Sequence, residues 1–440
     1  MRRGRFWKYL AAVCVLVSGG FCSCVELPRD EDRDASQGTP TPAEHTYARR
    51  NARRSAELDA PAEQRATSMW TLPRNLESDF EFVPDGSAAR AMLWFVTEDG
   101  VLVATASDTN ELILIDGAKG RILETHQMPL MGEDSIYWRP VQDGAGGLCA
   151  GGSGSVMSLN RDYSVDWLFE LDMPVIGPPG VRPRRETHCS AAATADAVVI
   201  AVWPSEQVLC FSRDGAFRWS FRMTAYNEAT PPSIDAMGNV YVGDSAGLLY
   251  CISPIGDLHW RARAYEGAAN GSALLVGAPI VGPDGVIWQG TRHWLAAVSP
   301  TGEVMWKYPN HYRGAIRVPP ALGLNGELYL GLDEWEEQRG EVEVRWSSHM
   351  CCLDPNGNEK WRVDTQPVSA APCVDGANTV VVGTKEGQVA AISEDGVVLW
   401  EVPIARSPIL KVLIGPCASL YVQCEDRRIF ALRGTATIEQ

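Results

Sequence analysis

The stretch Gly302-Glu303-Val304-Met305-Trp306 decides the fold, because its glycine and tryptophan recur along the chain with the same spacing. Two degenerate copies come first, with Glu124 where a tryptophan is expected and Tyr163 where a glycine is expected. The complete copies are Gly215/Trp219, Gly256/Trp260, Gly302/Trp306, Gly357/Trp361 and Gly396/Trp400. Successive tryptophan positions are 39 to 55 residues apart. A self-similar unit of this size is typical of repeat architectures.

Each repeat contains four short apolar segments separated by turns, as residues 277–309 illustrate. The expected strands of this copy are 278–281, 286–290, 294–298 and 303–308. Gly282-Pro283-Asp284-Gly285 and Ser299-Pro300-Thr301-Gly302 are typical turn sequences. Four short strands in about 40 residues, with Asp, Pro and Gly turns between them, predict one blade of a β-propeller.

Seven such copies follow one another from Ala91 onward. An eighth begins at Pro416 and lacks a full glycine–tryptophan strand. The segment around Trp70 can supply its missing strand. We therefore expect an all-β protein whose residues 66–440 form an eight-bladed β-propeller of four-stranded antiparallel blades, closed by an N-terminal strand near Trp70. Closure of the ring removes reactive sheet edges. The tryptophan is expected to fill the wedge between adjacent blades, and the glycine to allow the tight turn before it.

The N-terminus predicts export. Basic residues precede the apolar run 10–17, which is too short to span a membrane as a mature helix. Ser23-Cys24 with Phe21 is similar to a bacterial lipobox, although Cys22 makes the motif degenerate. Residues 1–24 are therefore interpreted as a lipoprotein signal peptide with Cys24 as the lipidation site, and ordinary cleavage without lipid is the alternative. Residues 25–65 lack an apolar period and are expected to be a flexible tether.

The charge balance argues against nucleic acid as a partner. The chain has a formal net charge of −16. Removal of the first 23 residues, with their four basic side chains, leaves 35 basic against 55 acidic residues, a net charge of −20. Such a surface repels phosphate backbones. After the signal, no stretch of about 18 apolar residues occurs, so a transmembrane helix is not expected.

The repeat pattern resembles a known family. A short strand with proline, a V-Y-V-G strand, a G-x-L-x-A-I/V strand and a G-x-x-x-W strand look like the pyrroloquinoline-quinone-type repeat. With a lipoprotein signal and eight blades, residues 66–440 resemble the BamB outer-membrane assembly family. The resemblance implies a periplasmic protein-binding scaffold. The same repeat also occurs in quinoprotein dehydrogenases.

Cys351-Cys352 invites comparison with the vicinal cysteine pair of those dehydrogenases. Cys352 lies five residues before a motif glycine, at a position that is small in every complete copy. The other residues at this position are Cys210, Cys251, Ala297 and Ala391. Packing in the core is therefore the expected role of this cysteine. Of twelve cysteines, nine remain after Cys14, Cys22 and a lipidated Cys24 are set aside, so at least one thiol is free or bonded to another chain.

No catalytic residue, metal site or cofactor can be assigned from the sequence. The seven histidines form no HExxH motif, no C-x-x-C motif occurs, and a glycine-rich phosphate loop is missing. Scattered Ser, His and Asp residues give no triad.

Departures from the repeat are the candidate contact sites, because loops on a rigid scaffold carry function. An acidic insertion, 333–339, separates the second and third expected strands of copy six and contains Trp335, a candidate docking residue. Tyr226, Arg313 and Arg317 precede first strands and are expected at the rim of the central funnel. The alternatives are a solvated hairpin tip and ordinary polar loops.

These features predict a non-catalytic, monomeric, lipid-anchored propeller in the periplasm, attached to the outer membrane. Its expected partner is another cell-envelope protein, such as outer-membrane assembly machinery. A quinone-dependent dehydrogenase and a propeller that binds a small molecule or glycan are the alternatives.

Overall fold

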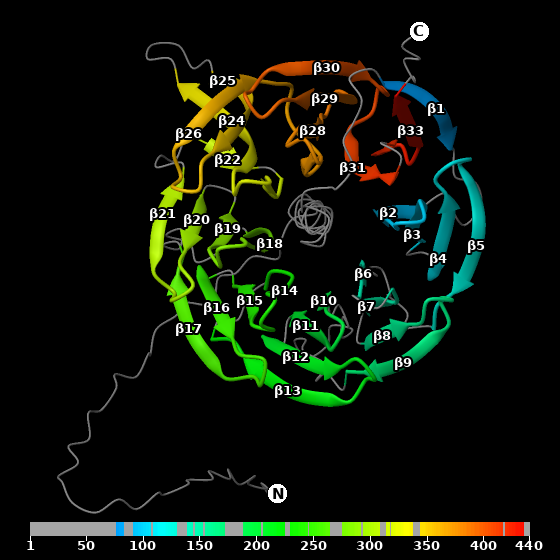
Figure 1. Cartoon of the computed structure of the whole chain (residues 1–440), viewed down its shortest axis with the longest axis vertical. Helices are drawn as coiled ribbons and strands as arrows, with labels where there is room; N and C mark the ends of the chain where they lie inside the picture. Colours follow the sequence, from blue (N-terminus) through cyan, green and yellow to red (C-terminus); the bar gives the residue numbers. More distant parts are fainter. Residues whose placement is uncertain are drawn as a thin grey trace, which may run out of the picture. The chain divides into compact units, whose positions relative to one another are not determined.

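The repeats form a ring of eight β-sheets in the computed structural model (Figure 1). The structure describes residues 76–82, 91–106, 109–129, 139–143, 146–152, 155–171, 188–203, 206–224, 229–244, 246–264, 275–291, 294–308, 314–316, 318–337, 344–416 and 419–434. Every named element in these ranges is a strand. No helix long and apolar enough to cross a membrane occurs in them.

Consecutive strands of each repeat are antiparallel neighbours in one sheet, which we call a blade. Blade one contains β2 (Ala91–Val96), β3 (Val101–Ala106), β4 (Glu111–Asp116) and β5 (Arg121–Gln127); blade two contains β6 (Arg139–Gln142), β7 (Leu148–Gly152), β8 (Ser155–Leu159) and β9 (Val165–Glu170). Blade three contains β10 (His188–Ala193), β11 (Ala197–Trp203), β12 (Gln207–Ser212) and β13 (Phe217–Arg222); blade four contains β14 (Ser233–Ile234), β15 (Val240–Gly243), β16 (Leu248–Ile252) and β17 (Leu258–Arg263).

The remaining blades follow the same order, with one extra short strand in blade six. Blade five contains β18 (Leu275–Val281), β19 (Ile287–Thr291), β20 (Leu295–Val298) and β21 (Val304–Tyr308); blade six contains β22 (Gly314–Ile316), β23 (Ala321–Leu322), β24 (Leu328–Glu337), β25 (Val344–Leu353) and β26 (Glu359–Asp364). Blade seven contains β27 (Cys373–Val374), β28 (Val380–Gly383), β29 (Gln388–Ile392) and β30 (Val398–Pro403); blade eight contains β31 (Ile409–Gly415), β32 (Ser419–Cys424), β33 (Ile429–Gly434) and β1 (Leu76–Phe82). First strands lie near the centre of the ring and fourth strands at its rim (Figure 1).

Blade eight combines the two ends of the propeller. β1 pairs antiparallel with β33, from Leu76 opposite Gly434 to Phe82 opposite Ile429. The expected closure by an N-terminal strand is thus confirmed, and the strand that closes the ring is β1. Trp70 lies outside the described residues.

The core lies between the blades. Second strands such as β15 and third strands such as β20 are buried along their whole length, because both faces of each blade pack against a neighbouring blade. This explains why these segments read as continuous apolar runs rather than as alternating ones. Fourth strands such as β30 alternate between exposed and half-buried positions.

Each fourth strand of blades one to seven has a β-bulge one residue before the tryptophan position. In blade five, for example, Trp306 pairs with Ala297 and Val304 pairs with Val298, which leaves Met305 without an opposite residue. The extra residues are Leu123, Asp166, Arg218, His259, Met305, Lys360 and Leu399. A bulge bends and twists a strand, which makes an exposed sheet edge a poor template for pairing with other chains.

The tryptophan of one blade docks on the glycine of the next. Trp260 Nε1 donates a hydrogen bond of 2.8 Å to the carbonyl of Pro300, two residues before Gly302. A Cβ on Gly302 would lie 2.8 Å from the indole of Trp260, and the φ of Gly302 is +88°. The wedge role expected for tryptophan is confirmed. The glycine has a second role beyond its turn, because only a residue without a side chain leaves room for the neighbouring indole. The same hydrogen bond is made by Trp167 to Arg213, Trp219 to Pro254, Trp306 to Pro355 and Trp361 to Glu394.

Candidate functional site

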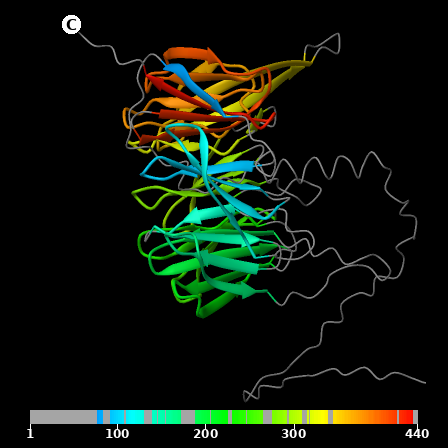
Figure 2. The same cartoon turned by 90° about the vertical axis from the view of Figure 1, so that its right-hand side faces the viewer.

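Blade six departs most from the repeat. β24 and β25 have ten residues each, whereas the second and third strands of the other blades have four to seven. The two strands pair without a bulge from Leu328 opposite Leu353 to Glu337 opposite Val344. Figures 1 and 2 show this hairpin, in yellow, projecting outward from the ring. The hairpin is therefore the main feature of blade six that the shared architecture does not require.

The structure changes the interpretation of the acidic insertion. Its residues 333–337 continue β24, rather than separating the second and third strands as the sequence suggested. The physical reason is that residues 344–348 of β25 supply a partner for each of them. Trp335 accordingly lies within a paired strand, opposite Trp346. A role for Trp335 in docking stays a prediction.

The other predicted contact residues cannot be placed. Tyr226, Arg313, Arg317 and the lipidation site Cys24 lie outside the described residues.

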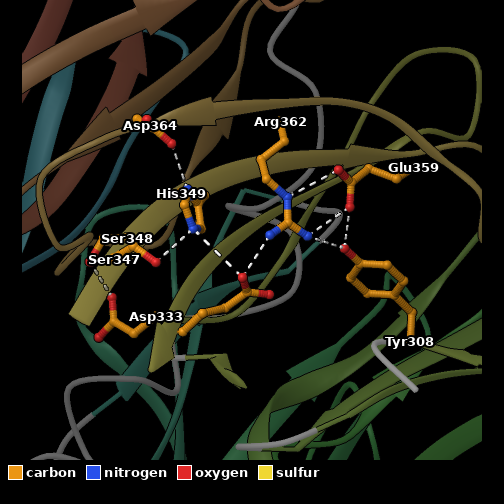
Figure 3. Close-up of polar contacts among 9 residues, drawn as sticks. Tyr308, Asp333, Ser347, Ser348, His349, Glu359, Arg362 and Asp364 are labelled. Atoms are coloured by element: carbon orange, nitrogen blue, oxygen red, sulfur yellow. Dashed lines mark hydrogen bonds and ion pairs between the residues drawn. The ribbon is translucent and has the colours of Figure 1, made fainter. Parts of the chain in front are cut away.

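A network of polar side chains joins the base of the hairpin to blade five (Figure 3). Arg362 of β26 is at its centre and donates to both carboxylate oxygens of Glu359, over 3.0 and 2.9 Å. It also donates to Glu334 of β24 over 2.8 Å and to the hydroxyl of Tyr308 in blade five over 3.1 Å. Tyr308 donates to Glu359 over 2.5 Å. One guanidinium thus links β24 and β26 to the neighbouring blade.

The pKa shifts of the network agree with this geometry. The hydrogen bonds with Arg362 lower the pKa of the Glu359 carboxyl, and the pKa of Arg362 is raised chiefly by its hydrogen bonds to Glu359. Burial raises the pKa of Tyr308. At neutral pH, Glu359 is therefore ionised, Arg362 is protonated and Tyr308 is neutral. The hydrogen bonds of Arg362 to the carboxylates are charge-assisted, and such bonds are stronger than those between neutral groups.

His349 of β25 forms a second set of contacts on the same side of the hairpin base (Figure 3). Its Nδ1 lies 2.8 Å from Asp364 Oδ1, and its Nε2 lies 3.0 Å from Ser347 Oγ. Glu334 Oε2 lies 3.7 Å from the same Nε2. On the far side of the hairpin, Ser348 Oγ donates to Asp333 over 2.7 Å.

Ser347, His349 and Asp364 have the connectivity of a nucleophile, a base and an orienting acid. The sequence did not reveal it, because Asp364 is brought to His349 only by the pairing of β25 with β26. In hydrolases that use such a triad the acid is buried, whereas the Asp364 side chain is 94% exposed. Water therefore screens the effect of the Asp364 carboxylate on the imidazole of His349. The arrangement is suited to holding strands together.

The vicinal cysteines pack as expected. Cys351 and Cys352 are free and fully buried, and they enter different cores on opposite faces of β25. Burial raises the pKa of each thiol to about 12. Such thiols behave as small apolar groups rather than as reactive ones.

The comparisons with known proteins agree with the fold. The family model described as "Outer membrane protein assembly factor BamB" matches residues 153–318 and 347–438. The structure is similar to BamB from Moraxella catarrhalis, with a TM-score of 0.57 and 15% identity over 82% of this chain and 100% of that one. No curated protein has a matching sequence.

Two dehydrogenases share the fold to a similar degree. A europium-containing methanol dehydrogenase matches with a TM-score of 0.60 and 12% identity, over 85% of this chain and 96% of that one. The quinohemoprotein alcohol dehydrogenase from Comamonas testosteroni matches with a TM-score of 0.60 and 12% identity, over 86% and 80% of the two chains. Identities this low show a common architecture alone.

Proposed function

Because this chain belongs to the family of the outer membrane protein assembly factor BamB, we propose that it is a non-catalytic scaffold that binds another cell-envelope protein. The observation that carries the proposal is the family match, which covers more than half of the chain and both halves of the propeller. The partner that this family suggests is a component of outer-membrane assembly.

The architecture supports a scaffold. Five consecutive seams are held by the same tryptophan–glycine contact, and the ring is closed by β1 and β33. A closed ring of this kind presents its loops from a rigid frame, which reduces the entropy lost when a partner binds. The polar network around Arg362 joins β24 and β26 to blade five, which adds to the rigidity of the frame.

Anchoring to the outer membrane is the second part of the proposal. Cys24 would carry the lipid, residues 25–65 would act as the tether, and the propeller would lie in the periplasm. Two or more acyl chains on one cysteine suffice for stable attachment, whereas a single chain does not.

Crosslinking in intact cells tests the scaffold role. The full-length chain is crosslinked in its own host, purified under denaturing conditions, and its adducts are identified by mass spectrometry. We expect one or more envelope proteins, with outer-membrane assembly components among them. Recovery of no envelope protein would sink the proposal.

Fractionation tests the anchor separately. We expect the wild-type chain in the outer-membrane fraction after a high-salt wash, and the Cys24→Ala variant outside it. Equal retention of both chains would rule out a lipid on Cys24. Spectral titration of the purified protein with pyrroloquinoline quinone and Ca²⁺ addresses the dehydrogenase alternative, for which a bound chromophore and reduction of a dye are the required signs.

A further inference from the structure

The hairpin of blade six lies in an internal gap of the family match, which begins only at residue 153. The match stops at residue 318 and resumes at residue 347, and the interval contains all of β24 and the first three residues of β25. The outer halves of β24 and β25 have no counterpart in the other seven blades, whose second and third strands are shorter, so their structure has to be explained locally.

The outer half of β25 has a free side. β26 ends at Asp364, opposite His349, and the next residue, Thr365, donates its N–H to the carbonyl of Ser348 over 2.9 Å. Pro367 follows, which has no N–H to continue the ladder. The chain then crosses to blade seven, where Lys385 N donates to the Pro367 carbonyl. Among the described residues, no strand pairs with 344–347 on this side of β25.

The main-chain groups on this free side can be assigned from the register. The Ser348 carbonyl points toward β26, and main-chain direction alternates along a strand. The N–H and C=O groups of Trp346 and Val344 therefore point into the open space beyond the end of β26. Those of Arg345 and Ser347 point toward β24. An open row of donors and acceptors of this kind is a template for an added strand.

The base of the hairpin is held rigidly next to this edge. Arg362 bonds Glu334 and Glu359, and His349 bonds Asp364 and Ser347 (Figure 3). The edge is thereby positioned before any partner arrives, so that binding requires little further ordering.

The charge around the edge specifies the occupant. The outer half of β24 contains Asp333, Glu334, Glu336 and Glu337, of which Glu334 is paired with Arg362, whereas the outer half of β25 contains one charged residue, Arg345. Asp364 lies at the inner end of the open row, with its side chain 94% exposed. A strand added to β25 would lie about 10 Å from β24, slightly more than the Debye length of about 8 Å at physiological salt, so the attraction is partly screened. Lysine and arginine on that strand would be attracted, and acidic residues repelled.

We propose that the free edge of β25, residues 344–347, binds an extended basic segment of a partner protein as an additional antiparallel or parallel β-strand. This deepens the scaffold function and rests on it only for the identity of the partner. Strand addition supplies affinity through the main chain of Val344 and Trp346, and the acids of β24 with Asp364 supply the preference for basic side chains.

Peptide binding to the full chain tests the site. The probe is a fluorescent Lys-Val-Lys-Val-Lys peptide, measured by anisotropy at physiological salt. We expect binding of this peptide, and no binding of Glu-Val-Glu-Val-Glu. A Lys-Val-Lys-Val-Lys peptide methylated on each internal peptide nitrogen keeps all three lysines but loses its main-chain donors, and it should bind at least about tenfold more weakly. Equal binding of the last peptide would mean simple charge attraction and would overturn the proposal.

A matched pair of variants tests the edge itself. Trp346→Pro removes an N–H that faces the open side and spares the hydrogen bonds between β24 and β25. Trp346→Ala removes the side chain and keeps that N–H. We expect about a tenfold loss of peptide affinity for the proline variant relative to the alanine variant. Hydrogen exchange on the wild-type chain provides a check without mutation, since added peptide should slow exchange of the Val344 and Trp346 N–H groups. Unchanged exchange there would contradict the proposal.

Crosslinking of the same variants in cells separates this inference from the scaffold function. If Trp346→Pro recovers the same envelope partner as wild type, the scaffold function stands and the β25 site is wrong. If the peptide binds at β25 but no envelope protein is recovered from either chain, the site stands and the scaffold proposal fails.

Discussion

The ring of Tyr163 in blade two packs against that of His126 in blade one, with centroids 5.6 Å apart. His126 in turn lies 2.9 Å from Glu124, the residue at the tryptophan position of blade one. Tyr163 is at the glycine position of blade two and has a φ of +62°. The two degenerate copies thus meet at one seam. Where the first blade supplies no indole, the second blade supplies its own aromatic ring.

Restoring the motif at this seam should show that the two departures are coupled. Glu124→Trp alone places an indole against Tyr163, and Tyr163→Gly alone leaves a gap, so each should lower the free energy of unfolding. The double variant rebuilds the contact seen at Trp260 and Gly302. Its free energy of unfolding should be about 1–2 kcal/mol higher than the value expected from adding the two single effects. A double-mutant cycle by urea unfolding measures this coupling. Additive effects would show that the two positions are independent.

Gly302→Ala should destabilise the propeller by about 2–4 kcal/mol, since an alanine is strained at a φ of +88° and its Cβ would collide with Trp260. Gly326→Ala is the matched control. Gly326 has a φ of +82°, but a Cβ there would lie 3.3 Å from the ring of Pro355, a much milder contact. The control should therefore lose only the backbone part, about 1–2 kcal/mol. If the free energy of unfolding falls by the same amount in both variants, the contact with the Trp260 indole contributes nothing to stability.

Glu359 should make the stability of the propeller depend on pH in the acid range. Its pKa is lowered from 4.5 in the folded state, chiefly by Arg362. A carboxyl with a lowered pKa stabilises the folded state fully above its unfolded pKa, and this contribution is lost as the pH falls through the folded pKa. Between pH 7 and pH 3, the wild-type urea midpoint should therefore fall more steeply than that of Glu359→Gln. Glu303→Gln, at an exposed position just before β21, should keep the wild-type slope, and a wild-type slope for Glu359→Gln would contradict the role of this pair.

Cys351 and Cys352 should be inert in the folded protein. With a pKa of about 12, on the order of one thiol in 10⁴ is ionised at pH 8, and both side chains are fully buried. Mass spectrometry after alkylation at pH 8 should find the peptide that contains them unlabelled in buffer and doubly labelled in denaturant. Rapid labelling of the native chain would show that blade six opens.

The sequence was most informative where the chain repeats. The Gly302–Trp306 spacing predicted the blades, their number and the closure of the ring, since periodic residues report a contact that every repeat makes. It could not show that each tryptophan docks on the glycine of the following blade, because that partner lies about 40 residues away and belongs to another repeat. The hairpin of blade six was misread for a related reason. Residues 333–337 are acidic and look like a loop, and only their pairing with β25 makes them a strand. Likewise, Arg362, Glu334 and Tyr308 come from three separate strands and share no motif.

The pairing of β1 with β33 has a consequence for how this chain is made. Leu76 pairs with Gly434, so the ring stays open through almost the entire course of synthesis. Seven blades can form in order from local hairpins, but the eighth requires both ends of the propeller at once, and pairing across so long a stretch of chain is slow. A chain released before its last strand would leave β1 without a partner and expose the inner faces of two blades. A stable product therefore requires the complete polypeptide. An incomplete chain would keep an open ring, and its unpaired strands would be accessible to proteases.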